Sequence, residues 1–179
     1  MRISNWCFVL LIQFGLVSFA AGQNAAAHKM EKHWSPPDKS FSIEVPVELH
    51  EIKGEYEDQS QDLFSSIRLF GSSEGDISHG VFKVVVLRLS KRNKSQGIEK
   101  LKGLESLIGG DEKEPSKTIV RKVAGLSAKE VLFVEETRCN KGLIIDGGKR
   151  VYVLGLSMPT CQQLDSAVAD RFFKSFHLR

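Results

Sequence analysis

Apolar and polar side chains alternate along several stretches of this chain, and a period of two is typical of half-buried strands. Residues 41–45 alternate in this way, and the stretch ends at Pro46. Residues 63–70 and 81–89 form two further stretches, and the Gly- and Ser-rich link between them predicts a hairpin. The uninterrupted apolar run at 84–87 predicts a strand that is covered on both faces.

In the stretch 63–70, the alternation also predicts which side chains share a face of the strand. One face is expected to carry Leu63, Ser65, Ile67 and Leu69, and the opposite face Phe64, Ser66, Arg68 and Phe70. The polar segment 48–61, which precedes this strand, is interpreted as a loop or a short surface helix.

Three more strands are expected in the C-terminal half of the chain, at 118–123, 129–137 and 149–156. Between the last two, the apolar segment 143–145 leads into Asp146-Gly147-Gly148. This sequence predicts a tight hairpin turn, because Asp-Gly tolerates the positive φ angles that such turns need.

Two helices are expected as well. The first begins at Ser95, a favourable N-cap residue, and ends at the glycine pair 109–110. Its apolar positions form one stripe: Ile98, Leu101, Leu104, Leu107 and Ile108. The second helix places Leu164, Val168 and Phe172 on one face, and a short final strand at 175–178 is expected to follow it.

This order of elements predicts an α+β fold, an antiparallel β-sheet flanked by helices in an α/β/α sandwich. The chain has 179 residues, within the one-domain range of roughly 100–200 residues. Residues 28–179 are therefore expected to form a single globular domain. The composition, with 41% hydrophobic and 26% charged residues, is that of an ordinary globular protein.

The N-terminal segment 1–27 is interpreted as a signal peptide with a short Ala-rich lead-in. Arg2 precedes the uncharged segment 6–21, as in secretory signals. Small residues allow cleavage after Ala20, Gly22 or Ala27. A retained membrane anchor is the alternative, but the apolar segment falls short of the roughly 18 residues that a spanning helix needs. We therefore expect a periplasmic or secreted protein with no stable membrane insertion after cleavage.

The charge of the secreted chain is nearly balanced. Loss of Arg2 with the signal peptide leaves 24 of the 25 basic residues against 22 acidic ones, a net charge of +2. This balance argues against nucleic acid as a partner, since nucleic-acid binding calls for clustered basic charge. One basic run is interpreted as a solvated strand end; it contains Arg88, Lys91, Arg92 and Lys94. Asn93 begins an N-glycosylation sequon.

Two cysteines, Cys139 and Cys161, remain after Cys7 leaves with the signal peptide. An even number in an exported domain suits a disulfide, which would close a loop of 22 positions and contribute about 3 kcal/mol through loop entropy. Two unpaired buried cysteines, or a metal or redox pair, are the alternatives. No C-x-x-C spacing supports the last of these.

One catalytic motif occurs in the sequence. Residues 71–75 satisfy G-x-S-x-G, the nucleophile-elbow pattern of serine hydrolases, with Ser73 as the nucleophile. That chemistry needs a helix directly after the turn, whereas a second strand is expected here. A hydrolase that uses Ser73 is therefore kept only as an alternative, and no enzyme activity is expected.

No metal or cofactor site is expected from the remaining residues. The five histidines, His28, His33, His50, His79 and His177, form no H-x-x-H or H-E-x-x-H pair. The acidic clusters at 55–58 and 111–114 lack the ligand order of a calcium loop and are interpreted as solvated loops. No glycine-rich phosphate loop is present in the sequence.

Three segments resemble the PsbP-like superfamily. Residues 41–46 (FSIEVP) resemble its opening strand, 150–159 (RVYVLGLSMP) its late strand, and 171–178 (RFFKSFHL) its closing signature. This superfamily includes extrinsic photosystem II proteins, a Ran-binding nuclear transport factor and bacterial exported proteins, and the last group is the most similar. The resemblance implies an antiparallel sheet between helices and a non-enzymatic, partner-binding role, but it assigns no binding residue.

We therefore expect an exported, non-catalytic binding module whose partner is an unidentified protein or envelope component. Two other functions are kept as alternatives: the hydrolase at Ser73 and a carrier of a small ligand. A carrier would need an enclosed apolar pocket in place of a filled core.

Overall fold

The computed structural model describes residues 32–53, 64–72, 80–90, 103–109 and 114–179. The predicted signal peptide, the lead-in and the rest of the chain up to residue 31 lie outside the described residues. Within the described part of the chain, no helix is long and apolar enough to cross a membrane.

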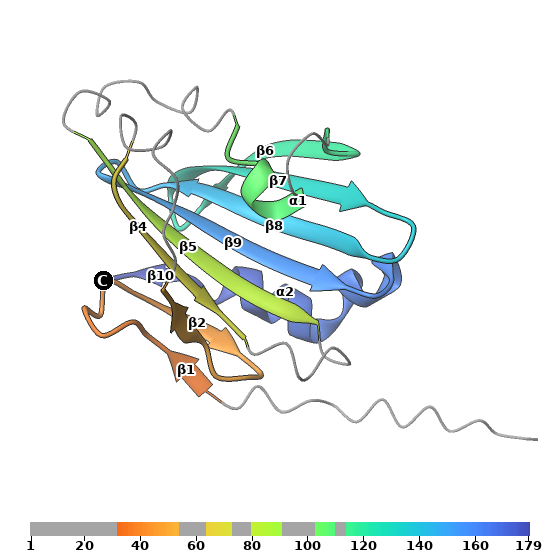
Figure 1. Ribbon diagram of the computed structural model, residues 1–179, viewed down its shortest axis with the longest axis horizontal. Coiled ribbons are helices and arrows are strands. Elements are labelled where there is room, and N and C mark those ends of the chain that lie inside the picture. Colours follow the sequence, from red (N-terminus) through yellow and green to blue (C-terminus); the bar gives the residue numbers. More distant parts are fainter. Residues whose placement is uncertain (1–31, 54–63, 73–79, 91–102, 110–113) are drawn as a thin grey trace, which may run out of the picture.

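A seven-stranded antiparallel sheet dominates the structure (Figure 1). In spatial order its strands are β3 (His50–Ile52), β4 (Phe64–Gly71), β5 (Val81–Leu89), β9 (Arg150–Met158), β8 (Cys139–Asp146), β7 (Leu126–Val134) and β6 (Lys117–Val123). The chain thus runs β3-β4-β5 from one edge, crosses to β6 at the other edge, and returns through β7 and β8 to β9. The first and second halves of the sheet meet where β5 pairs with β9.

A second sheet of three short strands packs beside the large one. β2 (Phe41–Val45) lies in its centre, with β1 (Lys32–Trp34) and β10 (His177–Leu178) paired to its two sides. The C-terminal helix α2 (Ala167–Lys174) follows a 3-10 helix, η5 (Cys161–Asp165). In Figure 1, α2 lies behind β9, whereas the short helix α1 (Ser106–Gly109) lies in front of β7 and β8.

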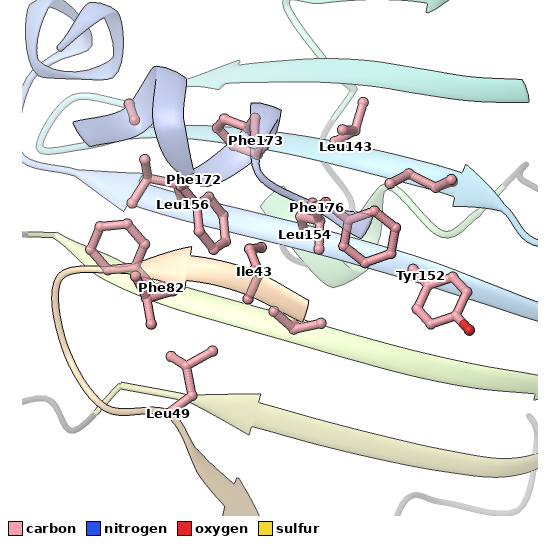
Figure 2. Packing of buried hydrophobic residues seen from close by; sticks show 14 of the residues in the cluster. Ile43, Leu49, Phe82, Leu143, Tyr152, Leu154, Leu156, Phe172, Phe173 and Phe176 are labelled. Atoms are coloured by element: carbon pink, nitrogen blue, oxygen red, sulfur yellow. The ribbon is translucent and has the colours of Figure 1, made fainter. Parts of the chain in front are cut away.

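The larger core lies between the big sheet, β2 and α2. Phe41, Ile43 and Val45 of β2 are fully buried in it, because alternate residues of this strand all face the large sheet. Figure 2 shows Phe172, Phe173 and Phe176 lying over Leu154 and Leu156 of β9. These three phenylalanines belong to the closing segment that the sequence analysis matched to the PsbP-like pattern, so that segment serves to cover the sheet.

The opposite face of the sheet carries a smaller core under α1 and a row of three glycines. Gly71, Gly155 and Gly142 lie on one line across β4, β9 and β8, with Lys83 of β5 between the first two. Without side chains, these positions leave room for Ile108 of α1 over Gly142 and for the aliphatic part of Lys83 over Gly155. Burial lowers the pKa of the Lys83 ammonium.

The α+β expectation holds only in its coarser form, since the structure is mostly an antiparallel sheet and not a helix-flanked sandwich. The smaller β-sheet covers part of the face on which a helix was expected, and α2 covers another part. Of the first predicted helix, the segment before residue 103 lies outside the described residues, and α1 has only four residues. Leu104 and Ile108 are nevertheless buried, as their stripe predicts.

Most predicted strands are confirmed, including the strand at 41–45 and the β4–β5 hairpin. The apolar segment 84–87 of β5 is buried, as predicted. The predicted hairpin turn at Gly147-Gly148 joins β8 to β9. β1 and β3 are short strands that the sequence analysis missed. The strand expected at 129–137 is wrong at its end, because β7 stops at Val134 and the chain turns before β8.

Two details of side-chain placement also differ from the sequence prediction. A β-bulge between Phe64 and Ser66 shifts the alternation, so Phe64 packs in the same cluster as Ile67 and Leu69. The second helix is broken at Ser166, whose hydroxyl caps the N-terminus of α2 by accepting a hydrogen bond from Ala169. Leu164 therefore lies in η5, although it is buried as predicted.

Candidate functional site

The outer edge of the large sheet is formed by β6, a strand of seven residues. Each of these residues is registered against β7, from Lys117 opposite Leu132 to Val123 opposite Leu126. No other strand of the described residues pairs with β6. In an antiparallel ladder every second residue directs its N–H and C=O away from its partner strand. The outer side of β6 therefore presents a row of backbone donors and acceptors.

The side chains of β6 are basic and apolar, and the strand contains no acidic residue (KTIVRKV). Ile119 is 40% exposed and Val120 is 68% exposed, one on each face of the sheet. Arg121 forms an ion pair of 3.0 Å with Glu130 of β7. Lys117 and Lys122 are exposed and form no ion pair with any described residue.

A cavity of about 190 Å³ adjoins this edge on the face that carries α2. Ile119, Leu132 and Leu164 give it an apolar lining, contributed by β6, β7 and η5. Its charged lining residues are Lys117, Glu130, Lys141 and Asp165. The cavity thus begins at the edge strand and extends beneath the 3-10 helix.

A disulfide fixes one wall of this cavity. Cys139 of β8 is joined to Cys161 of η5, with 5.1 Å between their Cα atoms. Cys161 lines the cavity. The sequence left open a disulfide, two unpaired buried cysteines, or a metal or redox pair, and the structure contains the disulfide. The bond holds η5 against β8 on the side of the cavity that Cys161 lines.

The positive charge of this region reaches the neighbouring helix. Lys141 of β8 forms an ion pair of 3.1 Å with Glu130 and lies 5.5 Å from the centre of the Phe173 ring. A hydrogen bond from Lys174 lowers the pKa of Asp170 in α2, and the charges of Lys141 and Arg121 add to this effect. Lys141 and Arg121 therefore act on α2 as well as on Glu130.

A second, more open depression lies along α2 and has a volume of about 370 Å³. Its charged residues are balanced in sign: Glu44, Asp170, Arg171 and Lys174. Two ion pairs join these residues to one another: Lys174 with Asp170, and Arg171 with Glu44. This depression offers less unpaired charge to a partner than the β6 edge does.

A third polar group, around Arg68, is structural. The Arg68 guanidinium hydrogen-bonds Glu51 at 2.8 Å and approaches Asp38 at 3.3 Å, which ties β3 and the 35–40 turn to β4. The hydrogen bond from Arg68 lowers the pKa of Glu51. Partial burial works to raise the pKa of Asp38, but hydrogen bonds from Ser40 and the charges of Arg68 and Arg150 outweigh it and lower that pKa.

The catalytic motif is only partly described. Ser73 lies outside the described residues. Gly71 ends β4, and Ser72 hydrogen-bonds the backbone of Phe82 in β5, both through its N–H and through its hydroxyl. Among the described residues, β4 precedes the motif and β5 follows it, and residues 73–79 lie outside the described part.

The other sequence-predicted positions are scattered. His33, His50 and His177 lie on three different strands, whereas His28 and His79 lie outside the described residues. No group of three His, Cys, Asp or Glu side chains that could hold a metal ion occurs among the residues that the structure describes. In the basic run, Arg88 is exposed on β5; Lys91, Arg92, Asn93 and Lys94 lie outside the described part.

The sequence analysis predicted the strand at 118–123 but not its role as an edge. The sequence of β6 did contain an indication of an edge strand. It has three basic residues among four uncharged ones and no acidic residue, which is typical of strands that lack a neighbour on one side. The cavity left no such signal, since its lining comes from segments as distant as Ile119 and Leu164.

This arrangement of a large antiparallel sheet, a small sheet and a C-terminal helix is the PsbP-like fold, as the resemblance of the three segments predicted. The structure is similar to the solution structure of cyanobacterial PsbP (CyanoP) from Synechocystis sp. PCC 6803, with a TM-score of 0.53 and 12% sequence identity. The match covers 83% of this chain and 92% of that chain.

A crystal structure of a protein from Bacteroides thetaiotaomicron is similar as well, with a TM-score of 0.50 and 16% identity. That match covers 84% of this chain and 49% of the Bacteroides chain, so this chain spans about half of its length. No protein-family profile and no curated protein matches the sequence. At these identities the likeness establishes the fold.

Proposed function

We propose that this protein is an exported, non-catalytic interaction module that receives a partner protein at the β6 edge and the adjoining cavity. The observation that carries the proposal is the coincidence of three features at one place. These features are an edge strand without a neighbour among the described residues, two exposed lysines on it that form no ion pair within the same part of the chain, and a cavity walled by a disulfide-fixed helix.

Open edges favour this function because an unpaired strand is a ready template for another chain. Native proteins restrict such pairing with lysine side chains, which repel unwanted strands of like charge. The β6 lysines fit a surface that is closed to copies of itself and open to a partner of opposite charge. Edge strands combined with side-chain pockets are a recurrent mode of peptide recognition.

The volume of the cavity favours a protein partner over a small ligand. Ligand pockets usually enclose about 300–1,000 Å³, whereas the cavity beside β6 has about 190 Å³. A single side chain of a docked protein suits that volume better than a cofactor does. This comparison gives less support to a small-ligand site beside β6.

An extracytoplasmic location is part of the proposal. The disulfide between Cys139 and Cys161 suits an oxidising compartment, since thiols are kept reduced in the cytosol. The predicted signal peptide at 1–27 points to the same compartment.

Site-specific photo-crosslinking in cells that naturally make this protein tests the proposal. A photoreactive amino acid at Val120 is expected to capture a protein partner, because this side chain is exposed at the centre of β6. The matched control carries the same group at Lys53, which is exposed beside the opposite edge strand β3. Equal capture at both positions, or none at Val120, would contradict the assignment to β6.

The non-catalytic part of the proposal has its own test. Purified protein treated with a fluorophosphonate probe is expected to remain unlabelled, since the Ser73 motif is followed by strand β5. Labelling that disappears in the Ser73→Ala variant would show a reactive serine and would replace this proposal with the hydrolase alternative.

A further inference from the structure

We propose that β6 binds an extended, acidic segment of the partner, which adds to the large sheet as a strand next to β6 and inserts one apolar side chain into the cavity. This inference rests on the proposed function and specifies its chemistry. It concerns the conformation, the charge and the anchor residue of the docking segment.

The conformation follows from the backbone of β6. All seven residues from Lys117 to Val123 are held in extended geometry by their register with β7. The outward-directed N–H and C=O groups are therefore already aligned for a further ladder. An extended segment satisfies these groups along its whole length, whereas a helix or a loop would satisfy only a few of them.

The charge of the segment follows from the two faces of β6. The register places Lys117 on the face of α2 and Lys122 on the face of α1. Side chains of an added strand alternate between these same faces. Acidic residues on either face of the segment would thus meet an unpaired ammonium group, and opposite charges on adjacent strands are favourable.

The anchor residue follows from the position of the cavity. Lys117 and Ile119 of β6 both line it, so it opens directly beside the line that an added strand would take. Leu132 and Leu164 give it an apolar part. Its two acidic residues are Asp165 and Glu130, and Glu130 is already paired with Arg121 and Lys141. In a segment with one apolar residue between acidic ones, the apolar side chain would enter the cavity and the acidic side chains would lie near Lys117 and Lys122.

A second copy of this chain fits the same edge poorly. Pairing of two β6 strands would bring together six basic residues, three from each KTIVRKV segment, with no acid from either strand. Like charges on adjacent strands are destabilising. Charge complementarity therefore favours a different, acidic protein as the occupant.

Binding of defined peptides to the full mature protein tests the inference. The probe is a fluorescein-labelled peptide of nine residues with a central Leu, with Glu residues placed on both faces of the strand and Thr at the remaining positions. Its two controls are the same peptide with Lys in place of Glu, and the acidic peptide with N-methyl groups on alternate residues of its hydrogen-bonding side. We expect the acidic peptide to bind at least tenfold more tightly than either control, with weaker binding at higher salt concentration.

Protein variants identify the surface that the peptide occupies. The double variant Lys117→Glu/Lys122→Glu is expected to weaken the binding of the acidic peptide at least tenfold. The matched control, Lys53→Glu/Arg88→Glu, makes the same charge change at exposed positions elsewhere in the described structure and is expected to bind as the unchanged protein does. The circular dichroism of each variant confirms that it is folded.

Several outcomes would overturn the inference. Equal affinity for the acidic and the N-methylated peptide would show that charge alone attracts the segment, without strand addition. A concentration-dependent dimer that competes with the peptide would show a second copy on β6. If crosslinking from Val120 captures a partner but the peptides fail to bind, the proposed function stands and this inference falls.

Discussion

At the scale of single residues, the close contact between α1 and the sheet depends on the absence of a side chain at Gly142. A Cβ atom at this position would lie 2.8 Å from Cγ2 of Ile108 and nearer still to two other atoms of that side chain. Ile108 is buried and has little room to move. The glycine is thus a packing requirement of the smaller core.

Gly142→Ala is expected to lower the free energy of unfolding by about 1–3 kcal/mol, the usual cost of overpacking a core. Gly155→Ala is the matched control and is expected to cost less, because its Cβ would meet the flexible aliphatic part of Lys83 at 2.6 Å. Urea denaturation measures both values. Equal losses, or no recovery when Ile108→Ala is added to Gly142→Ala, would contradict this explanation.

A pair of charged residues beside the same helix makes stability depend on pH. Lys129 of β7 donates a hydrogen bond to the Glu105 carboxylate, and the two side chains are only 19% and 15% exposed. Burial works to raise the pKa of Glu105, but this hydrogen bond and the Lys129 charge outweigh it and lower that pKa. A carboxyl whose pKa is lower in the folded state stabilises the fold above its unfolded pKa, and the stability is lost as the pH falls through the folded value.

Lys129→Met is therefore expected to lower the free energy of unfolding by about 1–3 kcal/mol at pH 7, because it leaves a mostly buried carboxylate unpaired. The loss should shrink toward pH 4, where Glu105 in this variant accepts a proton. Chemical denaturation at both pH values gives the comparison. In the control background Glu105→Gln, adding Lys129→Met should cost nearly the same at both pH values. A loss in Lys129→Met alone that is the same at both values would refute the argument.

At the scale of elements, the disulfide holds η5 against β8. It closes a loop of 22 positions, for which loop entropy predicts about 3 kcal/mol of stabilisation. Cys139→Ser/Cys161→Ser is expected to lower the free energy of unfolding by about 2–4 kcal/mol. Because Cys161 lines the cavity, we also expect the double variant to capture less partner from Val120. Unchanged stability and unchanged capture would contradict this role of the disulfide.

The elements show how far the sequence predicts the fold. The β4–β5 hairpin was predictable, because each strand has a clear period of two and the runs are joined by turn-forming residues. β3 was not predictable, since its three residues, His50–Ile52, are all exposed and carry no alternation. The same holds for the break at Ser166, because Leu164, Val168 and Phe172 keep a helical spacing on both sides of it.

At the scale of the whole molecule, the candidate surface depends on the order of strands in the sheet, which the sequence pattern does not contain. The strand at 118–123 was expected, yet its place at an edge is decided by the pairing of β5 with β9, which leaves β6 outermost. The cavity depends on the same long-range pairing and on the disulfide. The residue types of the candidate surface could be predicted from the local sequence, but their place at the edge of the sheet could not.

Amide hydrogen exchange along β6 tests the central claim most directly, because it reports on the backbone groups that a partner would cover. In the free protein, the outward amides of Lys117–Val123 are expected to exchange quickly, as those of an open edge do. Addition of the partner captured from Val120, or of the acidic peptide, is expected to protect these amides at alternate positions and to leave β3 unchanged. Protection at β3 or along α2 with none at β6 would contradict the account.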